Sequence, residues 1–138
     1  IADDSEMNRA ILREVLGEEF AVLEAANGEE GLEYLEEHEE DISLVLLDII
    51  MPVMDGFEVL RVMSEKNFLD NIPVIMISSE ESETYVKKAY EMGAMDYINR
   101  PFDAQVVYRR VFNTIKLYAK QRRLIALVTD QIKSELKK

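Results

Sequence analysis

The stretch LVLLDIIMPVMDGFEV, residues 44–59, decides how this chain folds. Its first four residues are apolar, and the fifth is a carboxylate, Asp48. A continuous apolar run is typical of a strand in a parallel sheet, because helices cover both faces of such a strand. Pro52 and the pair Asp55-Gly56 then turn the chain into an amphipathic segment. The stretch therefore predicts a buried strand that ends on a charge and is followed by a turn and a helix.

Strand and helix patterns alternate five times along the chain. Apolar runs predict strands over 1–2, 20–26, 41–48, 72–79 and 95–99. Amphipathic segments predict helices over 6–17, 28–38, 57–63, 81–94 and from 103 onwards. This alternation is typical of an α/β fold in which a five-stranded parallel sheet carries helices on both faces.

The last predicted helix is longer than the sheet needs. It runs from Asp103 to about Leu136, on the order of 50 Å at 1.5 Å per residue. Its first half has four apolar positions that suit a sheet face: Val107, Val111, Ile115 and Tyr118. Its second half carries another apolar stripe, and the steps from Gln121 through Ile125 and Val128 to Ile132 follow a heptad rhythm.

That second stripe has two interpretations. It is either a helix end that packs on nothing, or a parallel coiled coil that joins two copies of the chain. The second interpretation predicts a homodimer and a covalently linked output domain. It divides the chain into a domain over 1–118 and a helical extension over 119–138.

The composition excludes several kinds of site. The chain has 138 residues, of which 48% are hydrophobic and 32% are charged, which suits one globular domain with a short extension. It has no cysteine and a single histidine, His38. Disulfides and thiolate metal sites are therefore excluded within one chain, and a zinc cluster built on several histidines is excluded as well. No secretory leader or apolar stretch of about 20 residues is present, so we expect a cytoplasmic chain without a membrane partner.

The net charge of −12 is unevenly distributed. Residues 1–103 carry 26 acidic and 7 basic side chains, whereas residues 104–138 carry 2 acidic and 9 basic ones. The body is thus strongly acidic and the end of the chain is basic. An acidic body does not favour duplex DNA, so we expect no direct nucleic-acid partner for this domain.

Polar side chains follow the predicted strands where each strand ends. Asp3 and Asp4 come at the end of the first strand, Asp48 at the end of the third, Ser78 and Ser79 at the end of the fourth, and Arg100 after the fifth. The carboxyl ends of parallel strands meet at one edge of a sheet, where ligands usually bind. Carboxylates gathered there raise one another's pKa unless a cation lies between them. Oxygen ligands of this kind predict Mg²⁺ or Mn²⁺ at the edge.

Four motifs occur at these strand ends in a fixed order. They are DD at residues 3–4, LLDIIMPVMDG at 46–56, PVIMISS at 73–79 and DYINRPF at 96–102. With these motifs the chain, over residues 1–118, resembles the response regulator receiver domain of two-component signalling, and it is similar in extent to single-domain chemotaxis regulators. The resemblance implies a flavodoxin-like, doubly wound fold with strand order 2-1-3-4-5.

The resemblance also implies a role for each acidic residue. Asp48 is expected to take a phosphoryl group from a phosphohistidine of a sensor histidine kinase or phosphotransfer protein. Asp4, Asp48 and the backbone carbonyl of Ile50 are expected to ligate Mg²⁺ or Mn²⁺, and Asp3 to hold the ion through water. The domain is then a phosphoacceptor and not a multiple-turnover enzyme.

The remaining site residues belong to the switch that the resemblance implies. Ser78 is expected to bind a phosphoryl oxygen, and Tyr97 then to turn inward and alter the face made by the fourth helix, the fifth strand and the fifth helix. Arg100 stands where the family usually has lysine, and its planar fork differs from a compact ammonium. Ile50 and Glu80 stand where the family tunes the lifetime of the phosphoryl group.

Three other interpretations remain open. An aspartyl-phosphate hydrolase also uses a strand-end Asp as its nucleophile. Such enzymes resemble one another in a second Asp, two residues later, that serves as acid and base, and this chain has Ile50 at that place. A degenerate receiver used only for docking is favoured by Arg100 alone. A nucleotide-binding module would need a glycine-rich turn, and the first turn here reads DDSEMN. The long last helix resembles helices that join receivers to cyclic-dinucleotide enzymes, while a DNA-binding output or none also stays possible.

Overall fold

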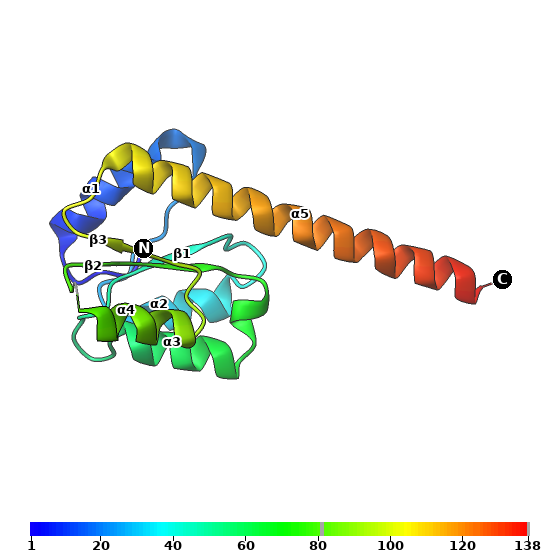
Figure 1. The fold of residues 1–138 in the computed structure, drawn as a ribbon, viewed down its shortest axis with the longest axis horizontal. Coiled ribbons are helices and arrows are strands. Elements are labelled where there is room, and N and C mark those ends of the chain that lie inside the picture. The colour runs from blue at the N-terminus through cyan, green and yellow to red at the C-terminus, as the bar shows by residue number, and fades with distance from the viewer. Residues whose placement is uncertain (81, 138) are drawn as a thin grey trace.

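The computed structural model describes residues 1–80 and 82–137. Its helices are α1 (Glu6–Leu16), α2 (Gly28–Glu37), α3 (Gly56–Glu65), α4 (Glu83–Glu91) and α5 (Ala104–Leu136), with short 3-10 helices at Gly17–Glu19 and Phe68–Asp70. Its strands are β1 (Val45–Leu47), β2 (Val74–Ser78) and β3 (Asp96–Asn99). Figure 1 shows the sheet with α1 and α5 on one side and α2, α3 and α4 on the other. The predicted α/β architecture with helices on both faces is confirmed.

The sheet is parallel, and its strands follow the order β1-β2-β3. Single parallel bridges join Ala2 to Ala25 on one side and to Leu47 on the other. Among the described residues the sheet has three strands where the sequence predicted five. The predicted strands over 1–2 and 20–26 are present only as single bridges at Ala2 and Ala25, because no consecutive residues continue the pairing there. The bridges place Ala2 between Ala25 and β1, while the lateral order of five complete strands stays a prediction.

Two apolar cores lie on the two faces of the sheet, because successive residues of a strand point to opposite sides. One core joins Leu46, Ile75 and Ile77 to buried residues of α1 and α5. The other joins Leu47 and Met76 to buried residues of α2, α3 and α4. All five residues of β2 are buried, as expected for the middle strand. The sheet edge that carries the polar residues is therefore held from both sides.

Side-chain caps begin the helices α1, α2, α3 and α5. The Ser5 hydroxyl accepts from the Asn8 N–H at α1, and the Asp55 carboxylate accepts from the Glu58 N–H at α3. Asp103 accepts from two backbone N–H groups at the start of α5. Caps of this kind satisfy N–H groups that have no partner within the helix. The predicted start of the fourth helix at Glu81 lies outside the described residues, and α4 is described from Glu83.

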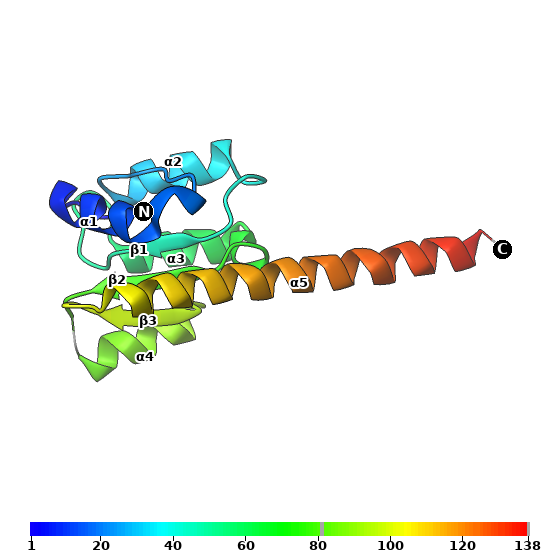
Figure 2. The same cartoon turned by 90° about the horizontal axis from the view of Figure 1, so that it is seen from above.

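Helix α5 leaves the domain after its first half (Figure 2). Val107 and Val111 are buried against the sheet, and Ile115 packs beside them, as predicted. Large apolar side chains beyond this point are exposed: Leu117, Leu124, Ile125, Leu127, Val128, Ile132 and Leu136. None of the described helices is both long and apolar enough to cross a membrane. The domain boundary at residue 118 stays a prediction.

Candidate functional site

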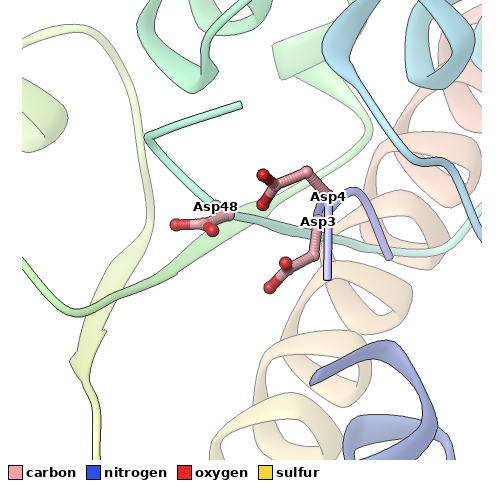
Figure 3. Close-up of side chains that lie close together, drawn as sticks. All are labelled: Asp3, Asp4 and Asp48. Atoms are coloured by element: carbon pink, nitrogen blue, oxygen red, sulfur yellow. The ribbon is translucent and has the colours of Figure 1, made fainter. Parts of the chain in front are cut away.

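Three carboxylates meet at the edge where the strands end. Asp3 and Asp4 follow the bridge at Ala2, and Asp48 follows β1. One oxygen from each of the three lies within 4.8 Å of the others. Figure 3 shows the carboxyl groups of Asp3, Asp4 and Asp48 gathered in one place. The predicted meeting of Asp3, Asp4 and Asp48 at this edge is confirmed.

Two of these carboxylates are buried and held by the backbone. Asp3 is 1% exposed and Asp48 is 8% exposed, whereas Asp4 is exposed to solvent. One oxygen of Asp3 accepts from the Ser5 N–H at 2.9 Å, and one oxygen of Asp48 accepts from the Ile49 N–H at 2.8 Å. The Asp48 N–H in turn donates to the Ala2 carbonyl at 2.9 Å. Both acidic side chains therefore have little freedom to move apart.

Arg100 reaches both buried carboxylates from the end of β3. Its Nη2 lies 2.5 Å from Asp3 Oδ2, and its Nη1 lies 3.5 Å from Asp48 Oδ2. Its backbone N–H donates to the Ser78 carbonyl at 3.0 Å, which ties it to β2. Its Nε is buried and has no hydrogen-bond partner within the described part of the chain. The strand-end cation predicted from sequence thus lies inside the acidic cluster.

The surroundings of Asp48 act on its pKa in opposite directions. Burial raises the pKa of Asp48 most, and the neighbouring charge of Asp3 raises it further. The positive charge of Arg100 lowers that pKa and partly offsets both effects, and the net direction is upward. A carboxylate in such a place keeps its charge best beside a cation.

Ser78 and Tyr97 are linked through the backbone of Glu80. The Glu80 N–H donates to Ser78 Oγ at 3.3 Å, and the Tyr97 hydroxyl donates to the Glu80 carbonyl at 2.6 Å. Ser78 is 1% exposed and Tyr97 is 7% exposed, so the tyrosine ring already points inward. Sequence analysis linked Glu80 only with phosphoryl lifetime. The backbone link had no signal in the sequence, because main-chain atoms carry no residue-specific pattern.

Arg9 is a second residue that the sequence analysis missed. Its Nη1 donates to the Asp3 carbonyl at 2.6 Å, and its Nε lies 3.3 Å from Glu24 Oε1. Arg9, on α1, therefore stabilises the backbone of the turn at Asp3 and Asp4. Its position one turn after the Ser5 cap was the only available signal.

The acidic cluster fits a hard divalent cation. Three carboxylates supply oxygen ligands, which Mg²⁺ and Mn²⁺ prefer, and together they carry more negative charge than Arg100 offsets. Ile50, whose carbonyl was assigned to the metal, follows Ile49 on the same loop, and its side chain is 58% exposed. A cavity of about 510 Å³ lies elsewhere, lined by residues such as Leu16, Val22 and Leu44. Exposed Asp4 and Ile50 leave the site open to solvent on one side.

Comparison with known proteins agrees with this geometry. The family model "Response regulator receiver domain" matches residues 1–112. The chemotaxis protein CheY of Halobacterium salinarum is 43% identical over 103 residues, which cover 74% of this chain and 82% of that protein. A probable cyclic di-GMP phosphodiesterase of Vibrio cholerae is 33% identical over 111 residues, which cover 80% of this chain but only 25% of that longer protein.

A solved structure shows the same arrangement of elements. It is the CheX-CheY-BeF3-Mg²⁺ complex of Borrelia burgdorferi, whose matched chain is 36% identical with a TM-score of 0.73. The match covers 81% of this chain and 84% of that chain. Together with the acidic cluster at the strand ends, these matches identify the chain as a member of the response regulator receiver domain family of two-component signalling.

Proposed function

We propose that the chain is a phosphoacceptor and that Asp48 receives the phosphoryl group. The observation that carries the proposal is the position of Asp48 at the end of β1, where its buried carboxylate lies beside Asp3 and Asp4 and within reach of Arg100. Ser78 ends the neighbouring strand β2 and reaches the same edge. A strand-end carboxylate with nearby positive charge is suited to phosphoryl transfer, because positioning and charge stabilisation dominate that chemistry.

The donor is a phosphohistidine of a sensor histidine kinase or phosphotransfer protein. A bond forms between an Asp48 oxygen and phosphorus, and the bond between phosphorus and the donor imidazole nitrogen breaks. The imidazole keeps the electron pair of the broken bond and takes up a proton. The product is an acyl phosphate on Asp48, and no oxidant or reductant takes part.

The acidic side chains also hold the cation that the family implies. Asp4, Asp48 and the Ile50 carbonyl would ligate Mg²⁺ or Mn²⁺, and Asp3 would hold it through water. When bound, the cation neutralises the charge that gathers on the phosphoryl oxygens. Arg100 supplies a further positive charge at the same edge, and the backbone contacts of Asp3 and Asp48 keep both carboxylates oriented.

The link through Glu80 supports a route for the signal. When a phosphoryl oxygen binds Ser78, the Ser78 hydroxyl moves away from the Glu80 N–H that it contacts now. The carbonyl of Glu80 accepts from the Tyr97 hydroxyl, so this change reaches Tyr97. Tyr97 lies on β3 between α4 and α5. A charge change at Asp48 thereby biases the face made by α4, β3 and α5.

Labelling with a small phosphodonor tests the proposal. With Mg²⁺ present, intact-mass measurement is expected to show one phosphoryl group per chain, and Asp48→Asn is expected to show none. Asp41→Asn, which changes an exposed carboxylate before β1, is the matched control and should label as the wild type does. Continuous phosphate release over many turnovers would support a hydrolase, and absence of label on the wild type would support a docking module.

We also propose that α5 joins two copies of the chain and leads to an output domain. The support is the exposed apolar stripe beyond residue 118, which includes Ile125, Val128 and Ile132 at heptad spacing. A second copy covers this stripe in a parallel coiled coil. The cyclic di-GMP phosphodiesterase that this chain resembles suggests one class of output, a cyclic-dinucleotide enzyme.

Solution mass separates this proposal from an unpartnered helix end. Residues 1–138 are expected to form dimers in analytical ultracentrifugation, with or without phosphorylation, and residues 1–120 to form monomers. Val128→Lys is expected to weaken the dimer, whereas Ser134→Lys adds the same charge outside the heptad seam and should leave it intact. Monomers of the full chain under every condition would refute the coiled coil.

A further inference from the structure

Each oxygen of the two buried carboxylates already faces a hydrogen-bond donor or a positive charge. Asp3 uses one oxygen for the Ser5 N–H and the other for Arg100 Nη2. Asp48 uses one oxygen for the Ile49 N–H, and its other oxygen lies 3.5 Å from Arg100 Nη1. Asp4 is the exposed member of the cluster. A cation that approaches this cluster therefore meets the guanidinium of Arg100 on the same oxygens.

We propose that Arg100 is a built-in counter-ion that competes with the divalent cation for Asp3 and Asp48. The inference rests on the proposed function, which assigns the acidic cluster to Mg²⁺. Without the metal, the guanidinium offsets part of the negative charge of the two buried carboxylates. When the metal binds, the guanidinium leaves Asp48 Oδ2, and the affinity for Mg²⁺ is lowered by the cost of this displacement.

The shape of the arginine side chain makes the double contact possible. A guanidinium presents donors in a planar fork, so Nη1 and Nη2 of Arg100 can face Asp48 and Asp3 at the same time. An ammonium is a compact point charge that offers no such fork. Arginine also keeps its proton in proteins, so it cannot release the carboxylates by losing its charge.

The position of Arg100 is also incompletely satisfied, which favours a second position. Its buried Nε has no hydrogen-bond partner among the residues that the structure describes. A buried donor without a partner is unfavourable. The side chain is 15% exposed and lies at an open edge, so solvent offers a path outward. If the guanidinium moved outward, Arg100 would lose its contacts with the two carboxylates, but Nε would lose no hydrogen bond.

Calorimetric titration with MgCl2 alone measures the competition, because it needs no phosphodonor. The Arg100→Gln variant is expected to bind Mg²⁺ at least about tenfold more tightly than the wild type, since both the positive charge and the planar fork are removed. The Mg²⁺ affinity of Arg100→Lys is expected to lie between those of the wild type and Arg100→Gln. Arg110→Gln is the matched control: it removes one positive charge whose nearest carboxylate is Asp96 at 3.5 Å, and its affinity for Mg²⁺ should equal that of the wild type.

A second measurement follows the guanidinium itself. In ¹⁵N-labelled wild-type protein, the Nε–H signal of Arg100, identified by its loss in Arg100→Lys, is expected to shift in step with Mg²⁺ occupancy. The signal of Arg110 should stay in place. If Arg100→Gln is unfolded without metal, as circular dichroism would show, Arg100→Lys and this signal still decide the question.

Equal or weaker Mg²⁺ binding by the Arg100 variants would overturn the proposal and leave Arg100 as a structural clamp. An Nε–H signal that does not respond to saturating Mg²⁺ would overturn it as well. Both outcomes are distinct from failure of the proposed function, because phosphodonor labelling of wild-type Asp48 is read separately. A wild type that accepts phosphoryl groups while its variants show no gain in Mg²⁺ affinity refutes the competition alone.

Discussion

The Tyr97 hydroxyl donates a hydrogen bond of 2.6 Å to the backbone carbonyl of Glu80. Since the Glu80 N–H contacts Ser78, this bond holds the segment after β2 against β3. Tyr97→Phe removes the bond and keeps the ring, so we expect a loss of about 1 kcal/mol in the free energy of unfolding. Urea denaturation measures the loss, and amide hydrogen exchange at Glu80 should become faster.

Tyr90→Phe is the matched control for this prediction. The Tyr90 hydroxyl makes a longer bond of 3.3 Å to Asp96 on the surface. Its removal is expected to cost less than about 0.5 kcal/mol, as is usual for exposed positions. If Tyr97→Phe and Tyr90→Phe lowered the free energy of unfolding by the same amount, the bond to Glu80 would stabilise the fold no more than a surface hydrogen bond does.

The backbone at Gly56 passes so close to the backbone of Asp48 that no side chain fits between them. A Cβ atom at this position would lie 2.3 Å from the Asp48 carbonyl oxygen and 2.9 Å from Ile49 Cα. Because both contacts are with backbone atoms, Gly56→Ala has to shift the loop. We expect it to lower the free energy of unfolding by about 3 kcal/mol or more and to weaken phosphoryl acceptance.

Gly31→Ala makes the same change where space is available. A Cβ there would meet Ala2 Cβ at 3.5 Å and Ala25 Cβ at 3.8 Å, which is ordinary contact. Within α2 we expect a neutral effect or a gain of up to about 1 kcal/mol, since alanine favours helix over glycine. Thermal unfolding compares the pair, and a stable Gly56→Ala variant would contradict the clash.

Val53 carries backbone strain in the loop after Asp48. Its φ of +68° lies in the left-handed region, which β-branched residues disfavour, and its side chain is exposed. Val53→Asn keeps the turn and suits this region, so we expect a gain of about 1 kcal/mol in stability. Val106→Asn, an exposed valine in α5, should change stability by less than about 0.5 kcal/mol. The prediction fails if urea denaturation shows no gain for Val53→Asn.

Ile50 is expected to lengthen the life of the acyl phosphate. Its exposed apolar side chain is two residues from Asp48, and we expect it to limit the approach and orientation of an attacking water. Ile50→Asn offers a polar group to that water, so the phosphoryl half-life should shorten. Loss of label after removal of the phosphodonor measures it, and Val53→Asn, a similar change three residues away, should not affect it. Matching half-lives for wild type and Ile50→Asn would exclude this role.

Local pattern was sufficient for much of this protein. The apolar run before Asp48 predicted a buried strand, and the structure has β1 there with all three residues buried. The helices predicted over 6–17 and from Asp103 onwards are present as α1 and α5, and each begins at a side-chain cap, Ser5 or Asp103. Helix starts and strand burial depend on residues close in sequence, so they are readable from it.

The number of complete strands was not readable in this way. Residues 20–26 have a strand pattern, yet the pairing there is a single bridge between Ala25 and Ala2, because a strand depends on its neighbour in the sheet as well as on its own pattern. The inward position of Tyr97 likewise depends on what packs beside β3.

Sequence pattern was enough to predict the α/β architecture and the residues that arrive at one edge of the sheet, because parallel strands end together. How those residues pair depends on the packing of segments that are distant in sequence. Arg100 and Asp3 are separated by 97 residues and meet at 2.5 Å, and the contact of the same guanidinium with Asp48 depends on the spacing of three chain segments. Sequence pattern predicts where charges gather, whereas the distances between their atoms, and hence their competition for a cation, follow from packing.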